Sequence, residues 1–207
     1  MIRQQVRPAV VMTLVLCVLT GVVYPGIVTA LARTIFPRQA AGSLVEVNGH
    51  VVGSALIGQT FTQPYYFHSR PSAAGAGYDG TASGGTNKGP TDRKLADTLV
   101  AAAIDSVVAQ DGGVKGQIPG DMVTASASGL DPDISPANAR LQIARVAAAR
   151  GTAPGALRTL VDAHIQGRQF GFFGEPRVNV LRLNIALDSA LPRRKAPAAS
   201  STPLIRN

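Results

Sequence analysis

PAVVMTLVLCVLTGVVYPGIVTALA, residues 8–32, is the stretch that decides the architecture of this 207-residue chain. The stretch carries no charged residue, and arginines precede and follow it. Its 25 residues exceed the roughly 20 that a helix needs to cross the hydrocarbon core of a bilayer. A helix also satisfies its own backbone hydrogen bonds, as a segment surrounded by lipid must do. We therefore expect a single N-terminal transmembrane helix over residues 8–32, followed by one folded domain.

A cleaved signal peptide is the alternative interpretation of this run. The basic start of the chain and the triplet Ala30-Leu31-Ala32 both fit a signal. The apolar core of a signal peptide has only about 7 to 15 residues, however, so the length favours an uncleaved anchor. Pro25 and Gly26 lie late in the run, and we expect them to kink the helix.

The orientation of the anchor depends on a small difference in charge. Two arginines precede the run and two follow it: Arg3, Arg7, Arg33 and Arg38. Positive charge favours the cytoplasmic side of a membrane, and the free amino terminus adds one charge before the run. We therefore expect residues 1–7 in the cytoplasm and an extracytoplasmic domain. The one cysteine, Cys17, lies within the run, so neither a disulfide nor a thiolate metal site is predicted in the domain.

Residues 33–191 have the length of one ordinary domain, and we expect an α+β fold for them. The formal net charge of the chain is +8, but eight basic residues flank the anchor or lie near the C-terminus: Arg3, Arg7, Arg33, Arg38, Arg193, Arg194, Lys195 and Arg206. The other basic residues are scattered and balanced by acids, which argues against nucleic-acid binding. Residues 192–207 have little to bury, so a disordered basic tail is predicted there.

Two patterns organise the first half of the domain. Runs of β-branched residues flank Asn48-Gly49, a pair that favours a tight turn, so a hairpin is predicted over residues 43–52. Residues 65–68, Tyr-Tyr-Phe-His, are an aromatic cluster typical of a core or subunit-contact strand. Residues 70–91 are too rich in glycine for a helix or a central strand, and we interpret them as a structured interaction loop. This loop is not a Walker A motif, because Lys88 precedes a glycine and a proline there.

The second half of the domain is predicted to be mainly helical. Ser135 is the expected N-cap of a helix that begins at Pro136. The predicted elements are helices over 92–110, 136–150 and 154–167, a short strand over 122–125, and an extended start followed by a helix within 177–191.

The candidate contact residues lie in the glycine-rich loop and on one helix face. Asn138, Gln142 and Arg145 form a polar stripe, which usually faces solvent but could equally hydrogen-bond the loop or a partner. The loop residues proposed to make contacts are Ser83, Gly84, Gly85, Asn87, Gly89 and Pro90.

No catalytic or metal-binding residue is predicted. The three histidines, His50, His68 and His164, lack metal-ligand spacing. Residues 131–135 place oxygens at alternate positions, as a calcium loop does, but an EF-hand would require glycine at Pro136 and glutamate at Gln142. The Gly-x-Ser-x-Gly nucleophile motif is absent from the sequence.

Several motifs, in this order behind one anchor, carry a resemblance to a known family. They include Thr20–Pro25, Ile57–Phe61, Tyr66–Ala73, Ser83–Thr91, Ser128–Ser135, Gln142–Ala147 and Gly174–Leu181. The chain resembles the C subunit of the bacterial Kdp potassium-transporting ATPase from the anchor to Asp188. Lys88 and Asp79 depart from the apolar residue and the asparagine expected at those positions.

The resemblance implies a non-catalytic, single-pass subunit of an inner-membrane complex that couples ATP hydrolysis to high-affinity potassium uptake. The implied partners are a potassium-channel-like subunit, a P-type pumping subunit, a small membrane subunit and membrane lipid. ATP and potassium would be handled by the complex, with no cofactor bound firmly here. The sequence has neither an Asp-Lys-Thr-Gly phosphorylation motif nor a Thr-Val-Gly-Tyr-Gly filter, which fits a role in assembly or regulation.

The resemblance also implies that the subunit stabilises the complex and raises the ATP affinity of the pump, with Gln142 as a nucleotide contact. This role conflicts with the expected topology, because an extracytoplasmic Gln142 would not meet cytoplasmic ATP. The alternative function is a membrane-anchored extracytoplasmic ligand-binding module, in which the glycine-rich loop contacts a glycan or a small ligand. An enzyme ranks third, for want of a nucleophile, a base or a metal cluster.

Overall fold

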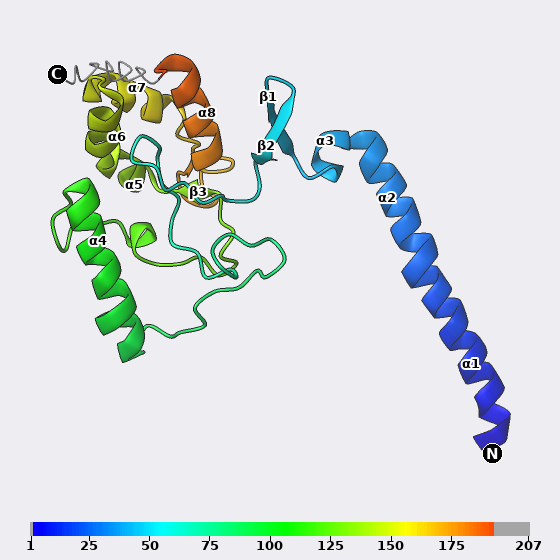
Figure 1. Cartoon of the computed structure of the whole chain (residues 1–207). Coiled ribbons are helices and arrows are strands. Elements are labelled where there is room, and N and C mark those ends of the chain that lie inside the picture. Colours follow the sequence, from blue (N-terminus) through cyan, green and yellow to red (C-terminus); the bar gives the residue numbers. More distant parts are fainter. Residues whose placement is uncertain (1, 193–207) are drawn as a thin grey trace, which may run out of the picture. The chain divides into compact units, whose positions relative to one another are not determined.

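The structure, a computed structural model, describes residues 2–192, so the tail predicted from residue 192 lies outside the described residues except for Pro192 (Figure 1). The chain divides into two compact units. The first unit ends at Ser54 and the second begins at Ala55.

The first unit begins with a long helix. It comprises α1 (Ile2–Val18), the π-helical turn η1 (Leu19–Val23) and α2 (Tyr24–Ile35), which follow one another without a break (Figure 1). Its residues Arg3–Ile35 are long and apolar enough to cross a membrane, with a mean hydropathy of 2.2 and no buried residue in the most apolar window. The predicted span, residues 8–32, is therefore the central part of a longer helix.

The helix continues through Pro25, which lies in the first turn of α2. Proline donates no backbone hydrogen bond, and its ring crowds the carbonyl four residues earlier. The preceding turn is wider than an α-helix, and the Tyr24 N–H bonds to the Leu19 carbonyl oxygen five residues back. A kink is predicted at Pro25 and Gly26, and the structure has a π-helical turn just before them.

A short helix and a hairpin complete the first unit. Helix α3 (Pro37–Ala40) precedes strands β1 (Leu44–Val47) and β2 (His50–Ser54), which pair antiparallel. Asn48 and Gly49 have φ angles of +53° and +78°, the left-handed values of a two-residue hairpin turn. The predicted hairpin is confirmed.

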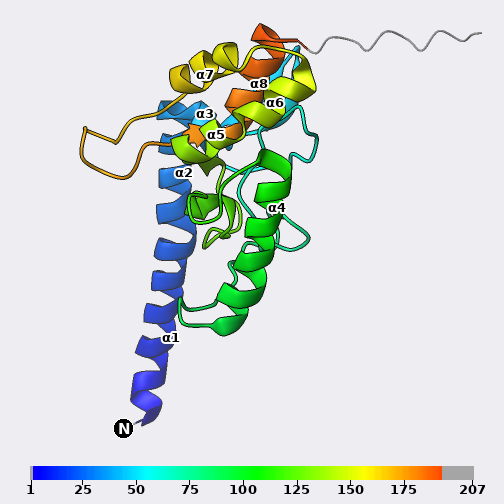
Figure 2. The same cartoon turned by 90° about the vertical axis from the view of Figure 1, so that its left-hand side faces the viewer.

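The second unit is mainly helical with one small sheet (Figures 1 and 2). Its helices are η2 (Lys94–Val100), α4 (Ala101–Asp111), η3 (Gly120–Met122), α5 (Pro136–Leu141), α6 (Ile143–Arg150), α7 (Pro154–Ala163) and α8 (Val180–Ala190). Strands β3 (Asp133–Ile134) and β4 (Val178–Asn179) pair antiparallel. The chain therefore combines one long N-terminal apolar helix with an α+β C-terminal region.

The core of the second unit lies among α5, α6, α7 and α8. Fully buried side chains from these helices and from the segment before the glycine-rich loop fill it: Phe67, Val146, Leu157, Val161, Leu183 and Leu187. Leu183 and Leu187 are one helical turn apart, so α8 presents both to the same core.

The predicted helix boundaries hold where local capping chemistry is strong. The Ser135 hydroxyl accepts a hydrogen bond from the Asn138 N–H at 3.1 Å, and Pro136 starts α5. Gly151, with φ of +64°, ends α6. Gln142 is both the C-cap of α5 and the N-cap of α6, so the predicted helix over 136–150 is divided there into two. Helix α7 is shorter than predicted and ends at Ala163.

Two predicted strands are wrong. Residues 122–125 begin within the 3-10 turn η3, where the Val123 N–H and the Thr124 hydroxyl both bond the Gly120 carbonyl oxygen, at 3.1 and 2.7 Å. Because these groups are already bonded within the turn, they are not available to pair with a neighbouring strand. Residues 65–68 are likewise not a strand, because Tyr65 and Tyr66 lie in a turn, with the Tyr66 N–H bonded to the Gln63 carbonyl oxygen at 3.0 Å, and side chains occupy the backbone groups of Phe67 and His68.

Candidate functional site

The backbone of Phe67 and His68 is held by two side-chain carboxamides. The Asn184 Oδ1 accepts from the Phe67 N–H at 2.9 Å, and its Nδ2 donates to the Phe67 carbonyl oxygen at 2.9 Å. Gln142 does the same for His68, with distances of 2.7 Å for the N–H and 3.0 Å for the carbonyl oxygen. Each carboxamide thus pairs with one residue as a neighbouring strand would. We call this arrangement the amide clasp.

Gln142 has no unused hydrogen-bonding position in this arrangement. Its Oε1 accepts from the His68 N–H and, at 2.6 Å, from the Arg145 Nη2. Its Nε2 donates both hydrogens, to the His68 carbonyl oxygen and, at 2.7 Å, to the Asn138 Oδ1. The side chain is 1% exposed. The predicted polar stripe therefore points into the protein at Gln142 and Asn138 instead of facing solvent.

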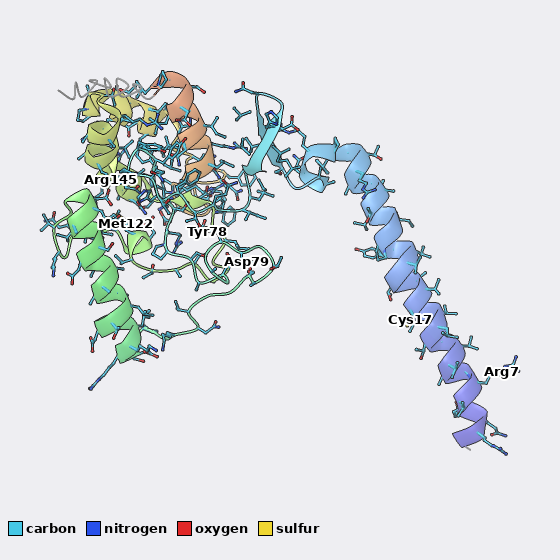
Figure 3. The ribbon with its side chains drawn as sticks, viewed as in Figure 1. Arg7, Cys17, Tyr78, Asp79, Met122 and Arg145 are labelled. Carbon is cyan, nitrogen blue, oxygen red and sulfur yellow. The ribbon has the colours of Figure 1, made fainter. Side chains whose placement is uncertain are left out.

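Arg145 extends the network through a buried ion pair. Its Nε donates to the Asp111 Oδ1 at 2.7 Å, and the two side chains are only 9% and 5% exposed. Its Nη1 donates to the carbonyl oxygens of Pro64 and Tyr66, at 2.7 and 2.9 Å. The guanidinium thereby ties the end of α4 to the aromatic segment. In Figure 3, Arg145 and Met122 lie near this end of α4.

Asp121 binds Asn138, at the N-terminal end of the polar stripe, and the helix cap Ser135. Its Oδ2 accepts from the Asn138 Nδ2 at 2.9 Å and from the Ser135 N–H at 2.7 Å. Its Oδ1 accepts from the Ser135 hydroxyl at 2.9 Å. The carboxylate therefore sits against the start of α5, where its charge also meets the N-terminal end of the helix dipole favourably.

Arg150 fixes the beginning of the aromatic segment to the end of α8. Its side chain is fully buried, and its Nε donates to the Tyr65 carbonyl oxygen at 2.8 Å. Its Nη2 donates to the Asp188 Oδ1 at 2.7 Å, and its Nη1 to the Leu191 carbonyl oxygen at 2.9 Å. The guanidinium carbon also lies 5.3 Å from the centroid of the Tyr66 ring.

The imidazole of His68 lies in the same network and titrates abnormally. Burial, and then the positive charge of Arg145, lower its pKa below the ordinary 6.5. The His68 Nε2 is 3.0 Å from the Gln63 carbonyl oxygen, which can only accept. We therefore assign the proton of the neutral ring to Nε2. Both Nη1 hydrogens of Arg145 are donated to carbonyl oxygens. The Arg145 Nη1 also lies 3.4 Å from the His68 Nε2, which brings the positive charge close to the imidazole without a hydrogen bond.

A cavity of about 260 Å³ lies beside the clasp. It is lined by residues of α4, the aromatic segment, η3 and α5, including His68, Val107, Asp111, Met122 and Gln142. None of the described residues that line it is a lysine or an arginine. Its volume is also slightly below the roughly 300 to 1,000 Å³ of typical small-molecule sites.

The glycine-rich loop packs on a different segment, residues 126–131. The Gly84 N–H and the Ser83 hydroxyl bond the Ser128 carbonyl oxygen at 2.9 and 3.0 Å. The Ser72 hydroxyl donates to the Gly129 carbonyl oxygen at 2.6 Å. A side chain on Gly85 would come within 2.9 Å of the Ala127 carbonyl oxygen. The loop is therefore ordered within its own unit, as its interpretation as a structured loop requires.

Several further bonds shape the loop. Tyr78 Oη donates to the Arg70 carbonyl oxygen at 2.7 Å, and burial raises the pKa of that phenol (Figure 3). Arg70 pairs with Asp131 at 2.9 Å. Asn87 adopts a left-handed φ of +52°, and the Asp92 N–H bonds the Gly89 carbonyl oxygen at 3.0 Å, next to Pro90.

The predicted contact residues thus fall into two groups, the three residues of the helical stripe and the residues 83–90 of the glycine-rich loop. Asn138, Gln142 and Arg145 meet in the clasp network, and their hydrogen bonds go to residues 64–68, 111 and 121 instead of to the loop. Sequence reasoning missed Asn184, although an asparagine one turn from Val180 and Leu187 on an apolar helix face is a signal of a buried polar contact. It also missed Asp111 and Arg150, for which no local pattern gave a signal.

Comparison with known proteins identifies the family. A family model described as the c chain of the K+-transporting ATPase, KdpC, matches residues 6–189. The potassium-transporting ATPase KdpC subunit of Gemmatimonas aurantiaca is 64% identical over 187 residues, which cover 90% of this chain and 93% of that protein. The KdpC subunit of Koribacter versatilis is 52% identical over 190 residues, covering 92% and 97%. That of Geobacter sulfurreducens is 50% identical over 191 residues, covering 91% and 100%.

These matches confirm the resemblance inferred from the sequence motifs. They span both units, from the apolar helix to α8. The chain therefore belongs to the KdpC family, the C subunits of the potassium-transporting Kdp ATPase.

Proposed function

We propose that this chain is a non-catalytic accessory subunit that stabilises the assembled Kdp ATPase. Its partners in this proposal are the potassium-channel-like subunit, the P-type pumping subunit and the small membrane subunit. The chain contributes a membrane anchor and a rigid domain, while ATP and potassium are handled by the partners.

The amide clasp is the observation that carries this proposal. The polar side chains of the network, Asn138, Gln142, Arg145 and Asp111, are buried and bonded within the chain, and Gln142 has all four of its hydrogen-bonding positions filled. A fully bonded buried network specifies one rigid arrangement, because each partner lost is costly. Such a network supports a scaffold that presents a fixed surface.

The same geometry argues against a nucleotide contact at Gln142. A nucleotide would have to replace bonds that hold the His68 backbone. Among the described residues, the lining of the neighbouring cavity offers the carboxylate of Asp111 and neither a lysine nor an arginine to a triphosphate. We propose that the subunit influences the ATP affinity of the pump through assembly, without contacting ATP.

We propose an inner-membrane location with residues 1–7 in the cytoplasm and the second unit outside it. The support is the helix Arg3–Ile35 and the extra charge of the amino terminus. A Val114→Cys variant in a Cys17→Ser background tests this orientation, because Val114 is 62% exposed. Labelling by an impermeant maleimide in intact cells supports it, and labelling only after lysis would reverse it.

Co-purification tests the function itself. The affinity-tagged chain, extracted in mild detergent from cells that express the whole Kdp operon, should carry the large membrane subunits with it. Recovery of the chain alone would favour the other function considered, a membrane-anchored ligand-binding module. A tagged variant lacking residues 2–35 controls for the contribution of the anchor.

A further inference from the structure

The segment between α7 and α8 exposes three phenylalanines at its tip. Phe170, Phe172 and Phe173 are 88%, 66% and 57% exposed, more than is usual for rings with no polar atom. Figure 2 shows this segment extending away from the helices of its own unit. The core of the second unit does not use these rings, and neither does the clasp network.

The tip has a definite shape. Gln169 and Phe173 exchange two backbone hydrogen bonds, each 2.9 Å long, and Gln166 pairs with Arg177 at the base. Gly171 and Gly174 have φ angles of +84° and +74°, and Phe170 also adopts a left-handed φ of +52°. The centroids of the Phe172 and Phe173 rings lie 4.2 Å apart. The apolar surface is therefore held outward by a closed turn.

The size and chemistry of the tip favour lipid over protein as its contact. Each phenylalanine carries roughly 150 to 250 Å² of surface, so the exposed parts add up to roughly 300 to 500 Å². A stable protein interface needs roughly 800 Å² per partner, with polar groups at its rim. Three rings without a hydrogen-bonding atom suit the hydrocarbon boundary of a bilayer, which asks for no polar partner.

The chain itself keeps the second unit close to a membrane. Only residues 36–54 separate the end of α2 from Ala55, and within them Leu44 pairs with Ser54, so the hairpin adds almost nothing to the reach. The remaining residues span at most roughly 30 Å. This step depends on the apolar helix being membrane-embedded, as proposed above.

From these observations we propose that the turn Gln169–Gly174 inserts its phenylalanines into the bilayer that holds the anchor. Arg168 flanks the turn and pairs with Glu175 at 2.7 Å, with the two side chains 45% and 78% exposed. Such an exposed pair is weak, so the guanidinium can exchange its carboxylate for a lipid phosphate at the level of the headgroups. The second unit then has two attachments to the membrane, the helix and this turn.

The absence of tryptophan from the chain makes a direct test possible. Phe172→Trp places one fluorophore in the turn, and Phe170→Trp provides a second, independent position. Val114→Trp is the matched control, because Val114 is 62% exposed in the same unit. The intact variants are reconstituted into vesicles of phosphatidylcholine and phosphatidylglycerol, with or without lipid brominated on its acyl chains.

The proposal expects blue-shifted emission and loss of intensity with brominated lipid at positions 172 and 170, and neither change at 114. Unchanged emission in vesicles that float together with the chain would overturn it while leaving the anchor intact. A blue shift seen only when the complete Kdp complex is reconstituted would also overturn it, in favour of a subunit contact. If the chain does not float with the vesicles, the apolar helix does not anchor it, and both the proposed anchor and the proposed insertion of the turn are wrong.

Discussion

Replacing Gln142 by methionine should destabilise the second unit without leaving a cavity at position 142. Methionine has nearly the volume of glutamine but no hydrogen-bonding amide, so Gln142→Met removes four bonds while keeping the packing. Other atoms of Asn138 and Arg145 keep their bonds, to Asp121 for the first and to Asp111 with two carbonyl oxygens for the second. The loss therefore falls on four groups, namely the N–H and carbonyl of His68, the Asn138 Oδ1 and the Arg145 Nη2.

The magnitude follows from these four groups. Each unmet buried group costs about 1 to 3 kcal/mol, and water in the adjacent cavity, which His68 and Asn138 line, offsets part of that loss, so we expect a cost of at least about 3 kcal/mol. Urea unfolding of the intact chain in detergent, followed by far-ultraviolet circular dichroism, measures the difference in free energy of unfolding. Gln110→Met is the control, because the amide of Gln110 is exposed and bonds only the Ser106 hydroxyl, so we expect a change below about 0.5 kcal/mol. A Gln142→Met variant as stable as this control would refute the structural role of the clasp.

Three further predictions concern the charges, the loop and the histidine of the same unit. Arg145→Ala leaves the buried Asp111 carboxylate unpaired and should cost about 3 to 5 kcal/mol in urea unfolding, whereas the double variant with Asp111→Ala should recover part of it. Gly129→Ala would place a methyl group 2.6 Å from the Gly84 carbonyl oxygen at a φ of +67°, so it should make residues 70–91 more sensitive to limited proteolysis. Gly112→Ala, at a φ of +72° with open space around it, should not. Because the pKa of His68 is lowered on folding, the unfolded chain binds more protons below pH 6.5, so stability should fall as the pH drops through that value, and His68→Gln should flatten this part of the profile.

The elements that could be predicted from the sequence are those specified by neighbouring residues. The Asn48-Gly49 turn and the Ser135 cap with Pro136 each depend on chemistry within a few positions. The length of the apolar run also predicted the N-terminal helix, and length and composition predicted α8, where the hydrophobic period alone was ambiguous between helix and strand. The helix over 92–110 exists as η2 and α4. The sequence places six apolar residues near one side of it: Leu95, Leu99, Ala102, Ala103, Val107 and Val108. Only Val107 among them is buried.

The clasp could not be predicted, because its partners are distant along the chain. Gln142 lies 74 residues from His68, and Asn184 lies 117 residues from Phe67. Periodicity shows which residues share a helix face, but it does not show whether a polar face meets water or a backbone in need of partners. For the same reason residues 65–68 were mistaken for a strand. Tyr65 and Tyr66 lie in a turn, and the carbonyl oxygens of all four residues bond guanidinium or carboxamide groups instead of a neighbouring strand.

The assignment of Gln142 to the scaffold instead of to a nucleotide site is the central claim, and calorimetric titration of ATP into the intact chain in detergent tests it most directly. With all four positions of the carboxamide filled, we expect no heat beyond that of dilution, in the wild-type chain and in Gln142→Ala alike. Saturable binding of ATP by the wild-type chain, lost in a Gln142→Ala variant that circular dichroism shows to be folded, would contradict the account.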